Sequence, residues 1–261
     1  MEYTQTLDTP SYLCDVDDRL HVWAAVRLCQ EVTEYHGTAT GIGFRVLLEQ
    51  DRAWVISRAL YNFYRRPDAF EPITLETWAR GNDGLFAFRD YHATDSQGRT
   101  LLTGTSYWPL IEMSTRRAVR LGKVVEGYEI IDRRATECDR LGKIVLPQFE
   151  EADVLAHRTV SHSMLDHTQH VNNSEYIRLI FDCLQPLGFS VDEPFSLELN
   201  YNHETRLGEE LTVRGTAIAA ASGDGVKPQP TSINCGSREI LIAVSNPRGL
   251  SVSAKITRLG V

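Results

Sequence analysis

The chain is 261 residues long, enough for one large domain or two ordinary ones, and 42% of its residues are hydrophobic. Its formal net charge of −8 at pH 7 argues against general nucleic-acid binding, because such binding needs a basic face that displaces counterions from phosphates. The five cysteines are scattered without a CxxC pair, which favours reduced thiols over a disulfide framework or a zinc site.

The first residues of the chain lack the basic lead and apolar core of a signal peptide. No apolar run elsewhere is long enough to span a bilayer. We therefore expect a cytosolic protein that does not insert into a membrane.

The first half predicts a helix followed by strands. Residues 20–36 carry apolar side chains at the spacing that lines one helical face, and these are Ala25, Leu28, Cys29, Val32 and Tyr35. Strand-like segments follow, separated by polar turn residues, and they span residues 54–64, 73–80, 85–94 and 99–111. One helix followed by antiparallel strands is an α+β pattern.

The second half repeats this plan. A helical stripe runs along Tyr176, Ile177, Ile180, Phe181 and Leu184, and Pro186 with Gly188 ends it. Residues 195–203 alternate between apolar and polar side chains, as a strand does. Further strands are predicted at residues 210–220, 238–246 and 250–259, and the segment 221–232, rich in Gly, Pro and Ser, is expected to form a surface hairpin loop.

An internal repeat is visible around two His-Val pairs. Asp17 lies four residues before His21, and Asp166 lies four residues before His170, at a common offset of 149 residues (170 − 21). Each pair is expected to open a long helix, so two copies of one helix-plus-sheet unit fit the length. We expect an N-terminal unit, a connecting segment and a C-terminal unit at residues 1–125, 126–155 and 156–261.

Four stretches of the sequence carry a resemblance to a known family. They are WVISRALYNFYRRPDAFEPITLETW and SYWPLIEMSTRRAVRL in the first half, and LDHTQHVNNSEYIRLIFD and LNYNHETRLGEELTV in the second. In this order they resemble the acyl-acyl carrier protein (acyl-ACP) thioesterases over nearly all of the chain. The resemblance implies a tandem, or double, hot-dog fold of the α+β class, in which an antiparallel sheet wraps each of two long helices. It also implies an N-terminal unit that binds the acyl chain and a C-terminal unit that is catalytic.

The family signature runs Asp, any, Asn, any, His, Val, Asn, Asn, with a Tyr three residues on. The matching positions here are Asp166, Thr168, His170, Val171, Asn172, Asn173 and Tyr176. Thr168 replaces the first catalytic Asn of the family, and its hydroxyl offers one donor where an amide offers two. The family's Glu-Cys pair after the next strand matches Glu204 and Thr205, so the carboxylate is kept and the thiol is lost.

The polar groups before the second helix fit thioester hydrolysis by water. The first backbone N–H groups of a helix have no intrahelical partners, so they and the helix dipole can stabilise an oxyanion. Glu204 is the candidate general base, and His170 would orient the water or protonate the leaving thiolate. Asp166 would fix the histidine tautomer by accepting its second N–H. Thr205 cannot serve as a cysteine nucleophile would, so Thr205→Ala should have a mild effect.

Plainer interpretations stay open for these residues. Asp166 could be a helix cap, His170 a satisfied polar residue and Glu204 a solvated strand end, although the combination of the three favours catalysis, with Thr168 beside them. Packing in the core would account for the two tryptophans Trp54 and Trp78 as well as a place in the lining of an acyl tunnel would. Five residues are candidates for substrate binding, some of them with an equally good structural role: Asn172, Asn173, Thr205, Trp54 and Trp78.

No metal ion or other cofactor is expected. Four histidines fall within residues 157–170, but their spacing does not match zinc motifs such as HExxH. The sequence has no GxSxG nucleophile elbow, no P-loop and no GxGxxG loop before a suitable helix.

The partner that the resemblance implies is an acidic acyl carrier protein, for which a confined basic patch would be needed. Three clusters are candidates for this patch: Arg65-Arg66, Arg116-Arg117-Arg120-Lys123 and Arg133-Arg134. Formation of a homodimer stays open.

The leading hypothesis is hydrolysis of acyl-ACP to free fatty acid in fatty acid biosynthesis. One active site is expected, in the second half, because Trp23 and Ala24 stand after His21 where two asparagines follow His170. Alternatives are the same hydrolysis on acyl-CoA, a non-catalytic acyl-binding hot-dog protein, and a dehydratase of 3-hydroxyacyl thioesters, since such enzymes also pair His with a carboxylate.

Overall fold

The computed structural model describes residues 2–219 and 230–260, and the chain forms two compact units, Met1–Leu141 and Gly142–Val261. Residues 126–150, all of them described, contain no helix or strand. The boundary between the units falls inside this stretch. None of the helices in the described ranges is long and apolar enough to cross a membrane.

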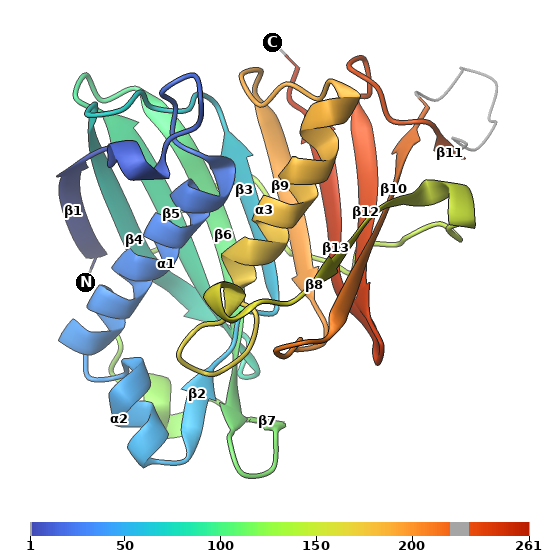
Figure 1. Ribbon diagram of the computed structural model, residues 1–261. Helices are drawn as coiled ribbons and strands as arrows, with labels where there is room; N and C mark the ends of the chain where they lie inside the picture. The colour runs from blue at the N-terminus through green and yellow to red at the C-terminus, as the bar shows by residue number, and fades with distance from the viewer. Residues whose placement is uncertain (1, 220–229, 261) are drawn as a thin grey trace. The chain divides into compact units, whose positions relative to one another are not determined.

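The first unit packs one long helix on an antiparallel sheet. The strand order is β1-β4-β5-β6-β3, and β2 and β7 extend the sheet by pairing with β6. Figure 1 shows α1 lying across this sheet. The elements are β1 (Glu2–Asp8), α1 (Val22–Ala39), α2 (Phe44–Glu49), β2 (Arg52–Trp54), β3 (Arg58–Phe63), β4 (Pro72–Asn82), β5 (Phe86–Asp95), β6 (Thr100–Glu112) and β7 (Arg117–Val119).

Helix α1 buries only part of the predicted stripe, including Cys29 and Val32. Val26, Cys29, Val32 and His36 are buried along it, whereas Tyr35 is 44% exposed. The prediction chose Tyr35 by apolarity, but the ring of Tyr35 packs beside Tyr3 of strand β1 at the edge of the sheet, with ring centroids 6.1 Å apart. The predicted strand at 54–64 is also divided, into β2 and β3.

The second unit likewise combines one long helix with an antiparallel sheet. Its strand order is β9-β13-β12-β10, all antiparallel, and β8 and β11 pair with β10. The predicted hairpin loop at 221–232 lies almost entirely outside the described residues. The elements are β8 (Val154–Thr159), α3 (Asn173–Leu184), β9 (Phe195–Tyr201), β10 (Glu210–Ile218), β11 (Pro230–Thr231), β12 (Glu239–Asn246) and β13 (Gly249–Arg258).

Helix α3 follows its predicted stripe. Tyr176, Ile177, Ile180 and Leu184 are buried, and Gly188 adopts φ 82°, the left-handed conformation that ends a helix. Each unit thus has the α+β pattern of one long helix on an antiparallel sheet, as the sequence predicted.

The two units repeat at a shift of 151 residues, not 149. The short 3-10 helices η1 (Ser11–Leu13) and η4 (His162–Met164) start 151 residues apart (162 − 11), as do α1 and α3 (173 − 22). His21, which caps α1, therefore corresponds to Asn172, and Arg19 corresponds to His170. The predicted pairing of His21 with His170 is wrong. The two His-Val pairs lie 149 residues apart, two fewer than the shift that superposes the secondary-structure elements of the two units.

Candidate active site

A tight loop before α3 carries the predicted polar cluster. The amide of Asp166 donates to the carbonyl of His170 (2.9 Å), and the amide of Gln169, at φ 64°, donates back to the carbonyl of Asp166 (3.0 Å). The amide of Val171 then donates to the carbonyl of Thr205 (2.9 Å). These bonds fix the loop against the segment that follows β9.

This loop brings His170 against Glu204, 34 residues later in the chain (204 − 170). The distance from Nε2 of His170 to Oε2 of Glu204 is 2.9 Å, and their side chains are 12% and 43% exposed. The imidazole is therefore shielded, while the carboxylate still reaches solvent. Glu204 does not point away from the loop, so the spatial meeting that the sequence predicted for these two groups is present.

Asp166 contacts His170 through Thr168 rather than directly. The Thr168 amide and hydroxyl both donate to Oδ1 of Asp166, at 2.8 and 2.6 Å, and the same hydroxyl lies 3.2 Å from Nδ1 of His170. Because the hydroxyl proton is directed at the carboxylate, its oxygen is free to accept from Nδ1–H. The expected direct Asp-His bond is thus replaced by a chain from Asp166 through Thr168 and His170 to Glu204.

The chain of contacts joins its two carboxylates through the imidazole. Nδ1 of His170 faces the Thr168 hydroxyl, and Nε2 faces Glu204 at 2.9 Å. The contact between Nε2 and the Glu204 carboxylate is therefore a path along which a proton can pass.

Helix α3 begins with one open amide. Asn172 is its N-cap and accepts from the amide (2.9 Å) and hydroxyl (2.7 Å) of Ser174. The amides of Val171, Asn172 and Glu175 also donate within the protein. At this end of α3, among the residues that the structure describes, the amide of Asn173 has no acceptor. Asn172, not Asp166, is the cap, and the helix start offers one N–H where the sequence suggested several.

Thr205 is enclosed by the second unit. It is fully buried, and its hydroxyl contacts Tyr176, Ser251 and Asn246. Its assignment to substrate binding stays a prediction from the sequence, and the burial of the side chain argues against it.

The two candidate tryptophans pack elsewhere than against helix α1. Trp78 is 1% exposed, and its indole N–H donates to the carbonyl of Arg133 (2.8 Å). It lies on the opposite face of β4 from Leu75, which faces α1, since successive strand residues alternate. Trp54 packs with Leu47 in a separate small apolar cluster and donates to the carbonyl of Ile42 (3.2 Å).

The first unit contains a small apolar pocket between α1 and the sheet. Leu28 and Cys29 of the helix line it, with Leu75 and Leu102 of the strands. Its volume is about 20 Å³, little more than the space of one water molecule by the same measure. An acyl chain could enter only if these side chains moved, and neither Trp54 nor Trp78 lines it.

The first unit carries a copy of the site without its chemistry. At the shift of 151 residues, Asp15 stands for Asp166 and Arg19 for His170. The Leu20 amide donates to the Pro67 carbonyl, as Val171 does to Thr205, so Arg66 occupies the position of Glu204. Arg66 is buried and forms an ion pair with Asp15. This copy therefore lacks both the imidazole and the acceptor carboxylate. The sequence had instead explained a single site by Trp23 and Ala24, which follow His21.

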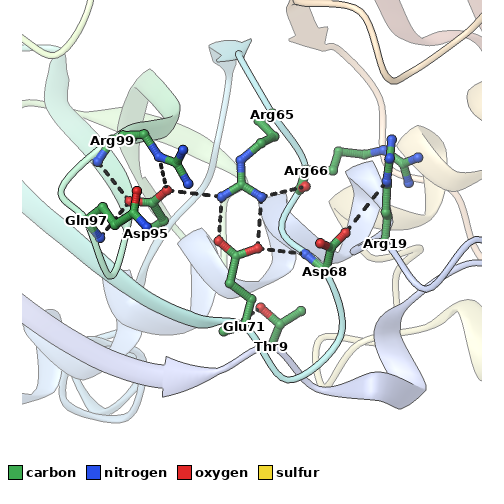
Figure 2. Close-up of polar contacts among 9 residues, drawn as sticks. All are labelled: Thr9, Arg19, Arg65, Arg66, Asp68, Glu71, Asp95, Gln97 and Arg99. Carbon is green, nitrogen blue, oxygen red and sulfur yellow. Dashed lines mark hydrogen bonds and ion pairs between the residues drawn. The ribbon is translucent and has the colours of Figure 1, made fainter.

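A network of ion pairs lies beside Arg66 of this copy (Figure 2). Arg65 binds both Glu71 and Asp95, and Arg99 binds Asp95 at 2.7 Å. With Arg66 held by Asp15, the Arg65-Arg66 cluster is engaged inside the unit. It is therefore a poor candidate for the basic patch that the sequence proposed there.

The network makes an acid-sensitive contribution to stability. Burial acts to raise the pKa of Asp95, but hydrogen bonds from Arg99 and Gln97 lower it to about 2, from a usual value of 3.8. The Arg65 guanidinium likewise lowers the pKa of Glu71. Because the folded-state pKa is the lower one, this stabilisation is present above about pH 4 and is lost as the pH falls through the folded value.

We expect the free energy of unfolding to decrease between about pH 4 and pH 2, and to decrease less steeply in Asp95→Asn, which cannot take up the proton. Urea unfolding at a series of pH values measures this slope. Asp8→Asn, at the exposed end of β1, is the control. Equal slopes for wild type and Asp95→Asn would contradict the assignment.

The sequence matches two family models over most of its length. The Acyl-ACP thioesterase N-terminal domain matches residues 1–128, and the Acyl-ACP thioesterase C-terminal domain matches residues 149–240.

Curated plant proteins are similar to the chain. A chloroplastic dodecanoyl-[acyl-carrier-protein] hydrolase of Umbellularia californica is 28% identical over 237 residues, which are 86% of this chain and 62% of that protein. The chloroplastic oleoyl-acyl carrier protein thioesterase 2 of Arabidopsis thaliana is 22% identical over 222 residues, 77% of this chain and 59% of that protein. The chain thus spans about three fifths of the length of these relatives.

Two solved structures share the fold. An acyl-ACP thioesterase from Bacteroides thetaiotaomicron superposes with a TM-score of 0.74 at 21% identity, covering 98% of this chain and 97% of the other. The 12:0-ACP thioesterase from Umbellularia californica gives 0.77 at 22% identity, covering 98% and 96%. These similarities confirm the tandem hot-dog fold predicted from the sequence.

Proposed function

Because the chain belongs to the acyl-ACP thioesterase family, we propose that it hydrolyses the thioester of acyl-ACP and releases a free fatty acid, a step of fatty acid biosynthesis. The observation that carries this proposal is the 2.9 Å contact between His170 and Glu204. It lies next to the start of α3, where the Asn173 amide has no acceptor among the described residues.

The first step is attack by water. Glu204 takes a proton from a water molecule as the water oxygen bonds to the thioester carbonyl carbon. The carbonyl oxygen becomes an oxyanion, and the Asn173 N–H with the positive end of the α3 dipole stabilises it. Thr205 forms no covalent intermediate in this scheme, because its hydroxyl is buried.

The second step expels the thiol. As the tetrahedral intermediate collapses, the C–S bond breaks and Nε2 of His170 gives its proton to the thiolate of the carrier. The proton held by Glu204 then passes to Nε2, which restores the starting state. Asp166 and Thr168 hold the imidazole in place from its Nδ1 side during the cycle.

Carrier docking needs accessible positive charge near an acidic partner. Of the three candidate clusters, Arg133 and Arg134 contact Glu2 and Asp139. Arg117 and Arg120, in and just after β7, are exposed. We therefore favour the β7 hairpin for docking. Cytosolic location and a homodimer stay predictions from the sequence, and the curated relatives are named chloroplastic.

The test is a thiol-release assay on acyl carrier protein loaded with saturated and unsaturated acyl chains of graded length, with the matching acyl-CoA series beside it. Release from the carrier series supports the proposal. Faster release from CoA would move the substrate to acyl-CoA, and binding without release would indicate an acyl-binding protein. Appearance of a 2-enoyl product would indicate a dehydratase.

Thr168 gives a sharper prediction. Thr168→Val removes the link between Asp166 and His170, and we expect kcat to fall by about tenfold or more, the effect of one hydrogen bond to a charged group. Thr168→Asn keeps one donor and one acceptor and should stay near wild type. Steady-state kinetics on one acyl carrier substrate measures both.

The chain offers a matched control for this change. Thr212 also lies 3.2 Å from a histidine Nδ1, that of His157, on the exposed strand β8. Thr212→Val should leave kcat unchanged. A Thr168→Val enzyme as active as Thr212→Val would remove Thr168 from the mechanism.

A further inference from the structure

A buried cluster of hydroxyl and amide groups lies directly behind Glu204. Its centre is Thr205, which is fully buried. Around it are Tyr176 of α3, Asn246 at the end of β12 and Ser251 of β13. Three separate elements of the second unit therefore converge on the residue next to the candidate base.

The Thr205 hydroxyl uses its full hydrogen-bonding capacity. The Tyr176 hydroxyl donates to it at 2.8 Å and the Asn246 amide donates at 3.1 Å. Its own proton is then left for Ser251, whose hydroxyl lies 3.0 Å away. A hydroxyl has two acceptor sites and one donor, so this side chain is saturated. Burial raises the pKa of Tyr176 to about 12, which keeps Tyr176 a donor at neutral pH.

The same cluster holds the backbone of Glu204. The Asn246 side-chain amide also donates to the Glu204 carbonyl at 3.0 Å, and Arg248 donates to that carbonyl as well. The Thr205 carbonyl accepts from the amide of Val171, the neighbour of His170. The cluster thus holds the Glu204 carbonyl directly, and the Thr205 backbone joins it to the residue that follows His170.

Resting on the proposed hydrolysis, we propose that Thr205 is a positioning residue, and that its saturated hydroxyl, with Asn246, sets the place of Glu204 against His170. Valine at this position would leave the buried donors of Tyr176 and Asn246 without their acceptor. The cysteine that the family carries at this position could replace the hydroxyl only in part, because a thiol is a weak acceptor and donor. The sequence alone treated Thr205→Ala as mild because threonine is no nucleophile. The cluster reverses that expectation.

The experiment compares Thr205→Val with Thr205→Ser on an acyl carrier substrate. We expect Thr205→Val to lower kcat by about tenfold to a hundredfold, as small misplacement of a catalytic group does, with KM within about twofold. Thr205→Ser keeps the hydroxyl and should recover most of the loss. Thr216, also buried and hydrogen-bonded in this unit, gives the control Thr216→Val, which should not change kcat.

A double variant separates positioning from general damage. If Thr205 acts through Glu204, adding Thr205→Val to Glu204→Gln should lower kcat no further. A full additional loss in the double variant, or full kcat in Thr205→Val, would overturn the proposal. If Thr205→Val does not fold, Asn246→Asp takes its place, because it removes both amide donors. It should show the same loss of kcat, and it should cause no further loss when added to Glu204→Gln.

A second measurement does not depend on turnover. The imidazole nitrogen NMR signals of His170 depend on its contact with Glu204, so Thr205→Val and Asn246→Asp should shift them and Thr216→Val should not. If wild type releases no thiol, the proposed hydrolysis fails while these spectra still test the positioning. Unchanged His170 signals in both variants would reject the positioning alone.

Discussion

Glu204→Gln is expected to lower kcat on acyl-ACP by about 10²- to 10⁴-fold, the usual contribution of a general base. The amide has nearly the shape of the carboxylate but cannot take the proton from the attacking water. Because Glu204 is partly exposed and binds no acyl group in this scheme, KM should change little. Steady-state thiol release with a single acyl carrier substrate measures both constants.

The same unit contains a matched Glu-His contact for comparison. Oε1 of Glu210 lies 3.5 Å from Nδ1 of His157, and both side chains are exposed. Glu210→Gln should therefore leave kcat unchanged. Near wild-type turnover in Glu204→Gln would end the water-attack mechanism in this form, and the base would have to be sought elsewhere.

His170→Ala is expected to lower kcat on acyl-ACP by about 10²- to 10⁴-fold, because the thiolate then leaves without a proton donor and Glu204 loses its contact with His170. The effect should depend on the leaving group. An aryl thioester expels a stable thiolate that needs no proton, so its hydrolysis should suffer less in His170→Ala than hydrolysis of the carrier substrate. Glu204→Gln should lower the rate of hydrolysis of the aryl thioester and of the carrier substrate by the same factor.

His157→Ala is the control for this variant, since His157 also contacts a threonine and a glutamate. An equal loss on both thioesters in His170→Ala would contradict the role of general acid. It would favour a histidine that only orients water. The ratio of the two rates thus distinguishes the two roles that the sequence left open for this residue.

Local patterns predicted most of the fold. The stripe of Tyr176, Ile177 and Ile180 placed α3, and strand alternation placed β9, because helices and strands bury side chains with fixed periods. The same reasoning failed for Tyr35 on α1. Apolarity says that a side chain can be buried, but the position of the neighbouring strand decides whether it is.

The site was predicted in its residue types more than in its contacts. His170, Glu204 and Asp166 were expected to meet, and the 2.9 Å contact of the first two is present. The link through Thr168 was not foreseen, since the hydroxyl's reach to both neighbours depends on the turn at Gln169. The buried cluster around Thr205 had no signal in the sequence.

The sequence by itself determined the two long helices, most of the strands and the chemical groups available before α3, because these follow from periodicity and spacing along the chain. It indicated a duplication but misaligned the two copies by two residues. Only the tertiary structure decided which groups touch. Register between strands and the closure of loops bring atoms together across tens of residues, as for His170 and Glu204. The alignment of the two backbones, and not the similarity of the two sequences, showed that Arg19 and Arg66 of the first unit stand at the positions of His170 and Glu204.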